Sequence, residues 1–133
     1  MNKDIKVLDP NIFYGCSGRS GTCFASVTEL ESHFGPNKYN ESGDGKVSAS
    51  WTIEVAGKKL EIYGYKFHPY ESEYNLDERY SFSIAELDKG ALRSLQGIIP
   101  ELWLFTESDV RRIKDTYGPF DSYAIEKYIE KIY

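Results

Sequence analysis

Hydrophobic and polar residues alternate between Lys46 and Ala56, which predicts a β-strand with one buried face. A tight turn at residues 56–58 follows, and residues 60–67 form the expected return strand of a hairpin. A third strand of the same sheet is predicted where hydrophobic residues alternate with serines over 80–84. Shorter hydrophobic segments are further candidates: Ile5–Leu8, Asn11–Tyr14 and Thr22–Ala25 as strands, and Pro100–Phe105 as either a strand or a loop.

Helix-capping residues indicate four helices. Ser26 and Glu29 form a capping-box pattern, and Gly35-Pro36 ends the helix that they begin. The predicted N-caps of three later helices are Asp88, Ser108 and Asp121. Because strands come first and helices later, we expect an α+β fold, with a small antiparallel sheet of three to five strands and helices packed on one face. A chain of 133 residues predicts a single domain over 1–133.

The net charge and the cysteine content favour some classes of protein over others. The net charge of −5 argues against a general nucleic-acid binder, which normally carries a basic surplus. Neither a run of the ~18 apolar residues that a membrane span needs nor a secretory signal is expected. Two cysteines, Cys16 and Cys23, are compatible with a reduced cytoplasm. A bridge between them stays open, against the alternative of two ordinary thiols with one packed in the core.

Aromatic residues are concentrated between Tyr63 and Phe82, where seven of twenty residues carry rings. Strand alternation places Tyr63, Tyr65 and Phe67 on one face of the hairpin, while the other face is expected to pack under the C-terminal helices. Tyrosine suits recognition surfaces because it is amphipathic and loses little rotamer entropy. The alternative is that the rings form the second half of the core. The candidate binding residues are Tyr63, Tyr65, Phe67, Tyr70, Tyr74 and Arg79.

The sequence contains no complete catalytic, metal-binding or cofactor motif. Residues 15–22 resemble a phosphate loop but lack its lysine, so we expect a flexible turn there. The two histidines, His33 and His68, leave open a small hydrolase that uses one of them with a carboxylate. We expect no metal and no cofactor. The acidic residues of 71–78 are expected to form a solvated loop.

Arginines in a ring-rich chain also allow a nucleotide-binding protein. Base stacking combined with arginine–phosphate contacts holds small nucleotides. The candidate arginines are Arg79, Arg93, Arg111 and Arg112. The last two equally suit helix-surface ion pairs with Asp109 and Asp115. The nucleotide hypothesis predicts a concave pocket that holds both rings and guanidinium groups, within one chain or across a homodimer.

A series of motifs runs from Val27 to Lys66. It consists of Val27-Thr28-Glu29-Leu30, Phe34-Gly35-Pro36-Asn37, then Ser42-Gly43-Asp44-Gly45-Lys46 with the strand around Trp51, and Ile62-Tyr63-Gly64-Tyr65-Lys66. In these motifs the chain resembles a widespread group of small, mostly uncharacterised tailed-bacteriophage proteins. It departs from them at Gly64, where Asp or Asn is common, and beyond Leu87. The resemblance covers about a third of the chain and implies no particular reaction or ligand.

What the resemblance does imply is a phage or prophage accessory protein that acts in the cytoplasm of a bacterial host. Such proteins commonly bind host proteins or the nucleotide signals of host defence. The leading hypothesis is therefore a non-enzymatic binding protein that inhibits or redirects a host protein, including one of a defence system. The alternatives are a sponge for a small nucleotide messenger and the hydrolase based on His33 or His68.

Overall fold

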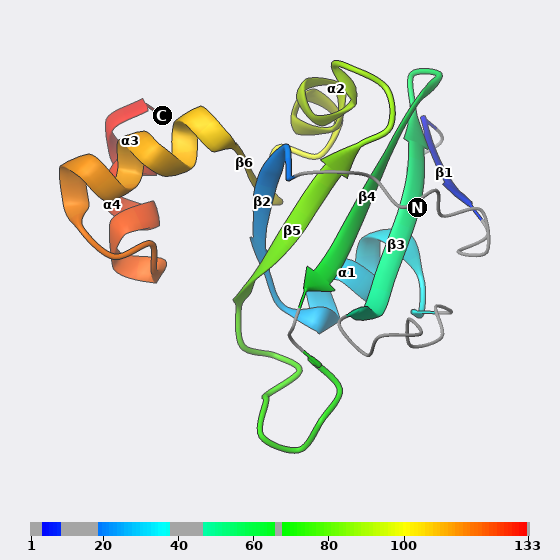
Figure 1. The fold of residues 1–133 in the computed structure, drawn as a ribbon, viewed down its shortest axis with the longest axis horizontal. Coiled ribbons are helices and arrows are strands. Elements are labelled where there is room, and N and C mark those ends of the chain that lie inside the picture. Colours follow the sequence, from blue (N-terminus) through cyan, green and yellow to red (C-terminus); the bar gives the residue numbers. More distant parts are fainter. Residues whose placement is uncertain (1–3, 9–18, 38–46, 66–67, 133) are drawn as a thin grey trace.

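One antiparallel sheet of six strands organises the chain, in the order β1-β3-β4-β5-β2-β6 (Figure 1). The computed structural model describes residues 4–8, 19–37, 47–65 and 68–132. The strands are β1 (Ile5–Leu8), β2 (Gly21–Ala25), β3 (Val47–Val55), β4 (Lys58–Tyr65), β5 (Tyr80–Glu86) and β6 (Trp103–Thr106). The helices are α1 (Val27–Phe34), α2 (Ala91–Ile98), α3 (Glu107–Tyr117) and α4 (Ser122–Ile132). The α+β class is confirmed, and the sheet exceeds the expected size because two strands of 4 residues, β1 and β6, pair at its edges.

The β3–β4 hairpin forms as the alternating pattern predicts. Val55 pairs with Lys58, so the connecting loop consists of Ala56 and Gly57, with φ values of 52° and 77°. Positive φ at both loop positions matches the right-handed twist of the paired strands. The hairpin therefore fixes the register of the central strands. The predicted end of its second strand, residues 66–67, lies outside the described residues.

One face of the sheet packs against α1 and α2. Trp51 and Phe82 are buried on this face, and their rings meet edge to face with centroids 6.2 Å apart. The two helices contribute Leu30, Phe34, Leu92 and Leu95 to the same hydrophobic cluster. The central hairpin thus packs under α1 and α2; the prediction that it packs under the C-terminal helices holds for α2 and is wrong for α3 and α4.

Helix α2 is held on this face by a side chain of β5. The Glu86 carboxylate accepts hydrogen bonds from the backbone N–H groups of Gly90 and Leu92, both at 3.0 Å. Gly90 is the N-cap, whereas the predicted cap, Asp88, accepts a hydrogen bond from a backbone N–H of β4 at 2.8 Å. A carboxylate from the sheet therefore takes the place of a local cap. The helix also continues one residue beyond its predicted end at Gly97.

Helices α3 and α4 pack on the opposite face, at the β2–β6 end of the sheet. Phe24 and Phe105 form a second hydrophobic cluster with these helices, whereas their strand neighbours Cys23 and Leu104 belong to the first cluster. Consecutive strand residues point to opposite faces. Helices consequently cover both faces, and the expectation of a single covered face is wrong. The reason is that β2 and β6 carry large hydrophobic side chains on both faces, so each face requires cover.

Two of the predicted helix caps are confirmed. The Ser26 hydroxyl accepts a hydrogen bond from the Glu29 N–H at 3.0 Å, and the Glu29 carboxylate accepts one from the Ser26 N–H at 3.1 Å. At the start of α4 the Asp121 carboxylate accepts a hydrogen bond from the Ala124 N–H at 3.0 Å. Both contacts satisfy backbone donors that the first helical turn leaves without partners.

Helix α3 starts from Thr106, and the prediction of Ser108 as its N-cap is wrong. The Thr106 hydroxyl accepts a hydrogen bond from the Asp109 N–H at 3.1 Å, and the Asp109 carboxylate accepts one from the Thr106 N–H at 3.2 Å. Thr106 is also the last residue of β6. Because the strand passes directly into the helix, no loop residues mark this boundary in the sequence.

Cys23 is a free thiol and is fully buried in the first cluster. Burial raises the pKa of this thiol far above its ordinary value. The prediction of one core-packed thiol is therefore confirmed. Cys16, the candidate strand at 11–14 and the start of the glycine-rich turn lie outside the described residues. Across the described parts of the chain, no helix combines the length and apolar character that crossing a bilayer demands.

Candidate functional site

The hairpin tyrosines lie on the face opposite α1 and α2. Tyr63 pairs with Ser50 on β3, on the other side of the sheet from the buried Ile62, as the alternation predicts. Tyr63 is half-buried, and Tyr65 is 49% exposed. Tyr65 thus lies at the surface and is not buried in a second core. Phe67 lies outside the described residues.

Residues 68–79, called the acidic loop from here on, precede β5 and are attached to the first turn of α1. The Thr28 N–H donates to the Leu76 carbonyl at 3.1 Å. The Thr28 hydroxyl lies 3.1 Å from the same carbonyl and 2.5 Å from the Asp77 carboxylate. The backbone N–H and the hydroxyl of Thr28 therefore both hold the loop at Leu76 and Asp77, with the single hydroxyl hydrogen shared between the two acceptors.

Two further contacts join the loop to α1. Arg79 forms an ion pair with Glu29, at 2.8 Å between Nε and Oε1. Partial burial alone would raise the pKa of Glu29, but hydrogen bonds from Arg79 and Ser26 outweigh it and hold that pKa below its usual value. The Tyr70 hydroxyl donates to the Glu31 carboxylate at 3.3 Å. Desolvation and the Glu31 charge raise the pKa of Tyr70, so its phenol stays protonated as a donor.

The loop is also closed by contacts of its own. The Tyr80 hydroxyl accepts a hydrogen bond from the Asn75 N–H at 3.1 Å and donates to the Glu78 carboxylate at 2.8 Å. The Asn75 side chain accepts a hydrogen bond from the Asp77 N–H at 2.8 Å. The half-buried Tyr74 packs edge to face on Tyr80, with centroids 5.4 Å apart. Tyr74 therefore supports the conformation of the loop more than it forms its surface.

Large hydrophobic side chains are exposed mainly in and beside this loop. Among the described residues they are Tyr65 (49%), Tyr70 (43%), Leu76 (45%) and Tyr123 (64%). The first three fall within twelve residues of sequence, and only Tyr123 lies elsewhere, on α4. Four acidic side chains of the loop are exposed as well: Glu71, Glu73, Asp77 and Glu78. The acidic loop thus combines exposed rings with negative charge.

Arg79 joins the end of the loop to β6. Its guanidinium carbon lies 4.1 Å from the centroid of the Trp103 ring, a cation–π contact. Trp103 also stacks on Phe24, with centroids 6.2 Å apart and ring planes 9° from parallel. These contacts with Glu29 and Trp103 help to hold the end of the loop in place, and the prediction that Arg79 binds a partner is not tested by them.

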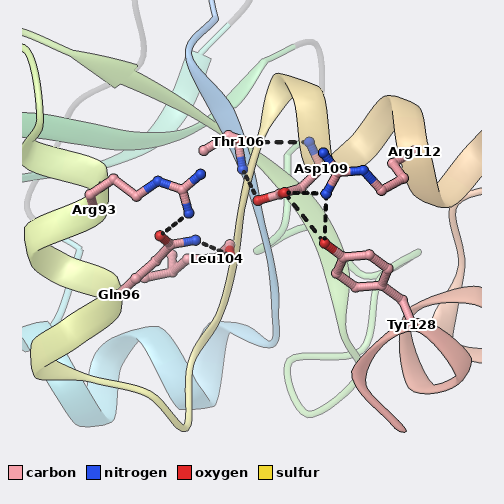
Figure 2. Close-up of polar contacts among 7 residues, drawn as sticks. All are labelled: Arg93, Gln96, Leu104, Thr106, Asp109, Arg112 and Tyr128. Carbon is pink, nitrogen blue, oxygen red and sulfur yellow. Dashed lines mark hydrogen bonds and ion pairs between the residues drawn. The ribbon is translucent and has the colours of Figure 1, made fainter. Parts of the chain in front are cut away.

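A groove of about 360 Å³ runs beside the edge strand β6. Four elements line it: α2 supplies Arg93 and Gln96, β6 supplies Trp103 and Phe105, α3 supplies Asp109, and α4 supplies Tyr128. Polar groups stand on both sides of β6 (Figure 2). The groove brings together rings and one guanidinium group, that of Arg93, whereas the nucleotide hypothesis predicts a pocket with several guanidinium groups.

On the α2 side, the polar groups form a chain that ends on the strand backbone (Figure 2). The Arg93 guanidinium donates to Gln96 Oε1 at 3.0 Å, and Gln96 Nε2 donates to the Leu104 carbonyl at 2.8 Å. The Gln96 side chain therefore occupies the position that a neighbouring strand would take. It also orients Arg93, whose other N–H groups stay available because the side chain is exposed.

On the other side of β6, Arg112 and Tyr128 meet Asp109 (Figure 2). The Arg112 guanidinium donates to Asp109 Oδ1 at 3.4 Å and to the Tyr128 hydroxyl at 3.2 Å. The Tyr128 hydroxyl donates to the same Asp109 oxygen at 3.4 Å. The predicted pairing of Arg112 with Asp109 is thus confirmed. All three distances are long for charge-assisted contacts, so the hydrogen bonds within this cluster are weak.

A buried carboxyl group lies on the same sheet face as Tyr63. Glu61 is 1% exposed and accepts a hydrogen bond from the Ser50 hydroxyl at 2.5 Å. Its other oxygen and the Thr52 hydroxyl have no hydrogen-bond partner in the described parts of the chain. Burial raises the pKa of Glu61 to about 7, and the hydrogen bond from Ser50 opposes this only partly. The alternating sequence pattern gives no sign of this burial.

The two histidines are not part of the groove. His33 lies near the end of α1, with its ring 5.9 Å from that of Phe34, and His68 starts the acidic loop. Neither lines the groove beside β6. Within the described residues, no group of three or more His, Cys, Asp or Glu side chains is arranged to hold a metal ion. The hydrolase alternative stays an untested prediction.

No family model, no curated protein and no solved structure matches this chain. The resemblance to small phage proteins therefore rests on the motifs of residues 27–66 alone. Function has to be inferred from the contacts, charges and cavities of the chain itself.

Proposed function

We propose that this chain is a non-enzymatic protein-binding module that recognises its partner with the acidic loop and the neighbouring Tyr65. The observation that supports this best is the combination of exposed hydrophobic side chains with a loop that is already fixed in shape. Tyr65, Tyr70 and Leu76 are exposed, yet the loop that carries two of them is tied to α1 at Thr28 and Glu29.

A fixed loop reduces the entropic cost of binding. An interface loop that orders on association loses about 0.5–1.5 kcal/mol per immobilised side chain. The contacts from Thr28, Glu29 and Glu31 make much of that ordering a property of the free protein. Tyrosine is also enriched among the residues that dominate interface energies. A rigid, tyrosine-bearing loop is therefore better suited to recognition than to solvation alone.

The charge of the loop specifies the chemistry of the partner. The loop has four exposed acidic residues and one arginine, Arg79. Because Arg79 is already paired with Glu29, it does little to reduce the negative charge of the loop. A partner surface must therefore supply basic residues around apolar sites that accept tyrosine rings. Electrostatic complementarity of this kind mainly raises the association rate and is screened by salt.

The phage resemblance sets the biological context of the proposal. It points to a bacterial host protein as the partner and to the host cytoplasm as the place of action. Binding of the acidic loop would then inhibit or redirect that host protein, including a component of host defence. No catalytic step is needed for this role.

The test uses the immobilised protein and lysate from bacteria. Wild-type protein is compared with the Tyr65→Ala/Tyr70→Ala variant and with Tyr123→Ala, which removes an exposed ring outside the loop. A partner retained by wild type and Tyr123→Ala, but lost by the double variant, supports the proposal. With the purified partner, we expect the double variant to bind about thirtyfold more weakly, as loss of a hot spot predicts.

Two controls separate binding from folding. Thermal unfolding of each variant establishes that the fold persists. Tyr70→Phe keeps the ring while removing the hydrogen bond to Glu31, so it should bind more tightly than Tyr70→Ala. If the same proteins are retained by all variants, or none is retained by wild type, the acidic loop is not a recognition surface.

A further inference from the structure

The groove beside β6 has a defined polar edge, because the pairing of β2 and β6 sets which residues face outward. The Glu107 N–H donates to the Ser20 carbonyl at 3.3 Å. Antiparallel partners alternate between hydrogen-bonded and non-hydrogen-bonded pairs, and Leu104, opposite Cys23, falls in a non-hydrogen-bonded pair. Its N–H and C=O therefore point away from β2, into the groove. The hydrogen bond from Gln96 to the Leu104 carbonyl agrees with this direction.

The outer edge of β6 is not open to pairing with another strand, because side chains already bond to part of its backbone. The Leu104 carbonyl is already bonded to Gln96, and the outward Thr106 N–H is already bonded to Asp109. An added strand would have to displace the Gln96 and Asp109 side chains to make its ladder of hydrogen bonds. The Leu104 N–H, in contrast, faces the groove between them. One acceptor group at this point would need no rearrangement of the edge.

The donors around that point favour an anion. Arg93 lines the groove, and the one carboxylate among the lining residues, Asp109, is paired with Arg112, which lies outside the groove. Because Arg112 offsets the Asp109 charge from outside, the Arg93 guanidinium is the positive charge that the groove offers to a ligand. Asp109 is in addition engaged by the Thr106 N–H, so its charge is partly compensated within the protein. A phosphate near Arg93 and the Leu104 N–H would meet charge-assisted donors.

The apolar part of the groove favours a planar group next to that anion. Rings of Trp103, Phe105 and Tyr128 line it. Its volume of about 360 Å³ is at the lower end of the range for small-molecule sites, roughly 300–1,000 Å³. This size suits a single base with its sugar and phosphate and excludes larger nucleotides from full burial.

We propose that the groove beside β6 binds one nucleoside monophosphate unit. Its phosphate is held by Arg93 and the Leu104 N–H, and its base lies beside the Tyr128 ring. This site lies outside the acidic loop. The proposal assigns the nucleotide hypothesis to one groove and to specific residues.

The experiment is calorimetry with the full chain, using AMP, GMP, CMP and UMP as probes, and adenosine as the probe without phosphate. We expect at least one monophosphate to bind and adenosine to bind at least about tenfold more weakly than AMP, since the charge-assisted contacts are lost. In ¹⁵N NMR spectra the same titration should shift the Leu104 amide and the Trp103 indole signals.

A pair of matched arginine variants tests whether Arg93 contributes to the binding of the monophosphate. Arg93→Gln should weaken binding of the monophosphate about tenfold or more, whereas Arg111→Gln, on the exposed surface of α3 outside this groove, should leave it within about twofold. Both residues are exposed, so neither change disturbs the core, and circular dichroism verifies this. The Tyr65→Ala/Tyr70→Ala variant, which leaves Arg79 and Trp103 unchanged, should bind the nucleotide normally, which keeps this test independent of the partner.

Three results would overturn the proposal. The first is no heat with any monophosphate. The second is equal weakening by Arg93→Gln and Arg111→Gln, since only a general effect of charge would then be present. The third is binding of indole-3-acetate as tight as that of AMP, which would reassign the groove to aromatic carboxylates.

Discussion

Replacing Glu61 by glutamine should make the stability of this protein less sensitive to pH. Glu61 is buried, bonds to Ser50 through one oxygen and has no partner for the other. Glutamine has the same shape and keeps an oxygen that accepts from the Ser50 hydroxyl, but it cannot ionise. The substitution therefore removes the titration while retaining most of the packing.

The direction of the effect follows from the raised pKa of Glu61. Below pH 4.5, its ordinary value, the carboxyl is protonated in both the folded and the unfolded protein, and folding pays no ionisation penalty. As the pH rises from 4.5 toward about 7, the unfolded state loses this proton first, so the free energy of unfolding decreases. Above pH 7 both states are ionised and the decrease is complete.

The size of the effect comes from the same two values. The difference between a folded-state pKa of about 7 and an ordinary value of 4.5 corresponds to about 3 kcal/mol. That is a substantial part of the roughly 5–15 kcal/mol by which a typical domain is stable. Wild-type protein should therefore lose about 3 kcal/mol relative to Glu61→Gln between pH 4.5 and pH 8.5.

Urea denaturation, followed by tryptophan fluorescence at several pH values, measures this difference. Other carboxyl groups titrate in both proteins, so the difference between wild type and variant isolates Glu61. Glu54→Gln is the matched control, because Glu54 lies on the same sheet face and is only half-buried. A constant difference between wild type and Glu61→Gln from pH 4.5 to 8.5 would refute the reasoning, whatever its absolute value.

Three further predictions concern the fold. Thr106→Ala should lower the free energy of unfolding by about 1 kcal/mol through loss of a helix cap, whereas Ser108→Ala should change it little; chemical denaturation distinguishes the two. Gly21→Ala should cost at least about 2 kcal/mol in the same assay, because the new Cβ collides with the β6 backbone and lies 2.8 Å from a Leu92 methyl group. Cys23 should react with a thiol reagent only when the protein unfolds, measured after Cys16→Ser substitution; rapid labelling of native protein would contradict its burial.

Local patterns predicted the centre of the fold well. The β3–β4 hairpin and the cap at Ser26 are determined by residues adjacent in the sequence, through alternation and a three-residue capping spacing. The cap of α2 was not predictable in this way, since it comes from Glu86 on the preceding strand. The short strand β6 was ambiguous because a continuous hydrophobic segment, residues 102–105, has no period that separates strand from loop.

The candidate sites also differ in how far local sequence patterns predict them. Of the rings that the sequence concentrates in one segment, Tyr65 and Tyr70 are exposed while Tyr63 and Tyr74 are half-buried, and their role in binding stays a prediction. The groove depends on residues from four elements, and only its final geometry shows that Arg93 and Tyr128 face one space. Arg93 was a candidate by residue type alone. The burial of Glu61 depends on long-range packing that no local pattern encodes.

Trp103 belongs to both surfaces at once, since it lines the groove and lies under the Arg79 guanidinium that ends the acidic loop. Any ligand that moves the Trp103 indole would therefore also change its cation–π contact with Arg79. If the nucleotide proposed for the groove and the partner proposed for the acidic loop both shift this indole, each must change the affinity for the other by the same factor. The Trp103 indole is thus the side chain through which the two proposed sites would be coupled.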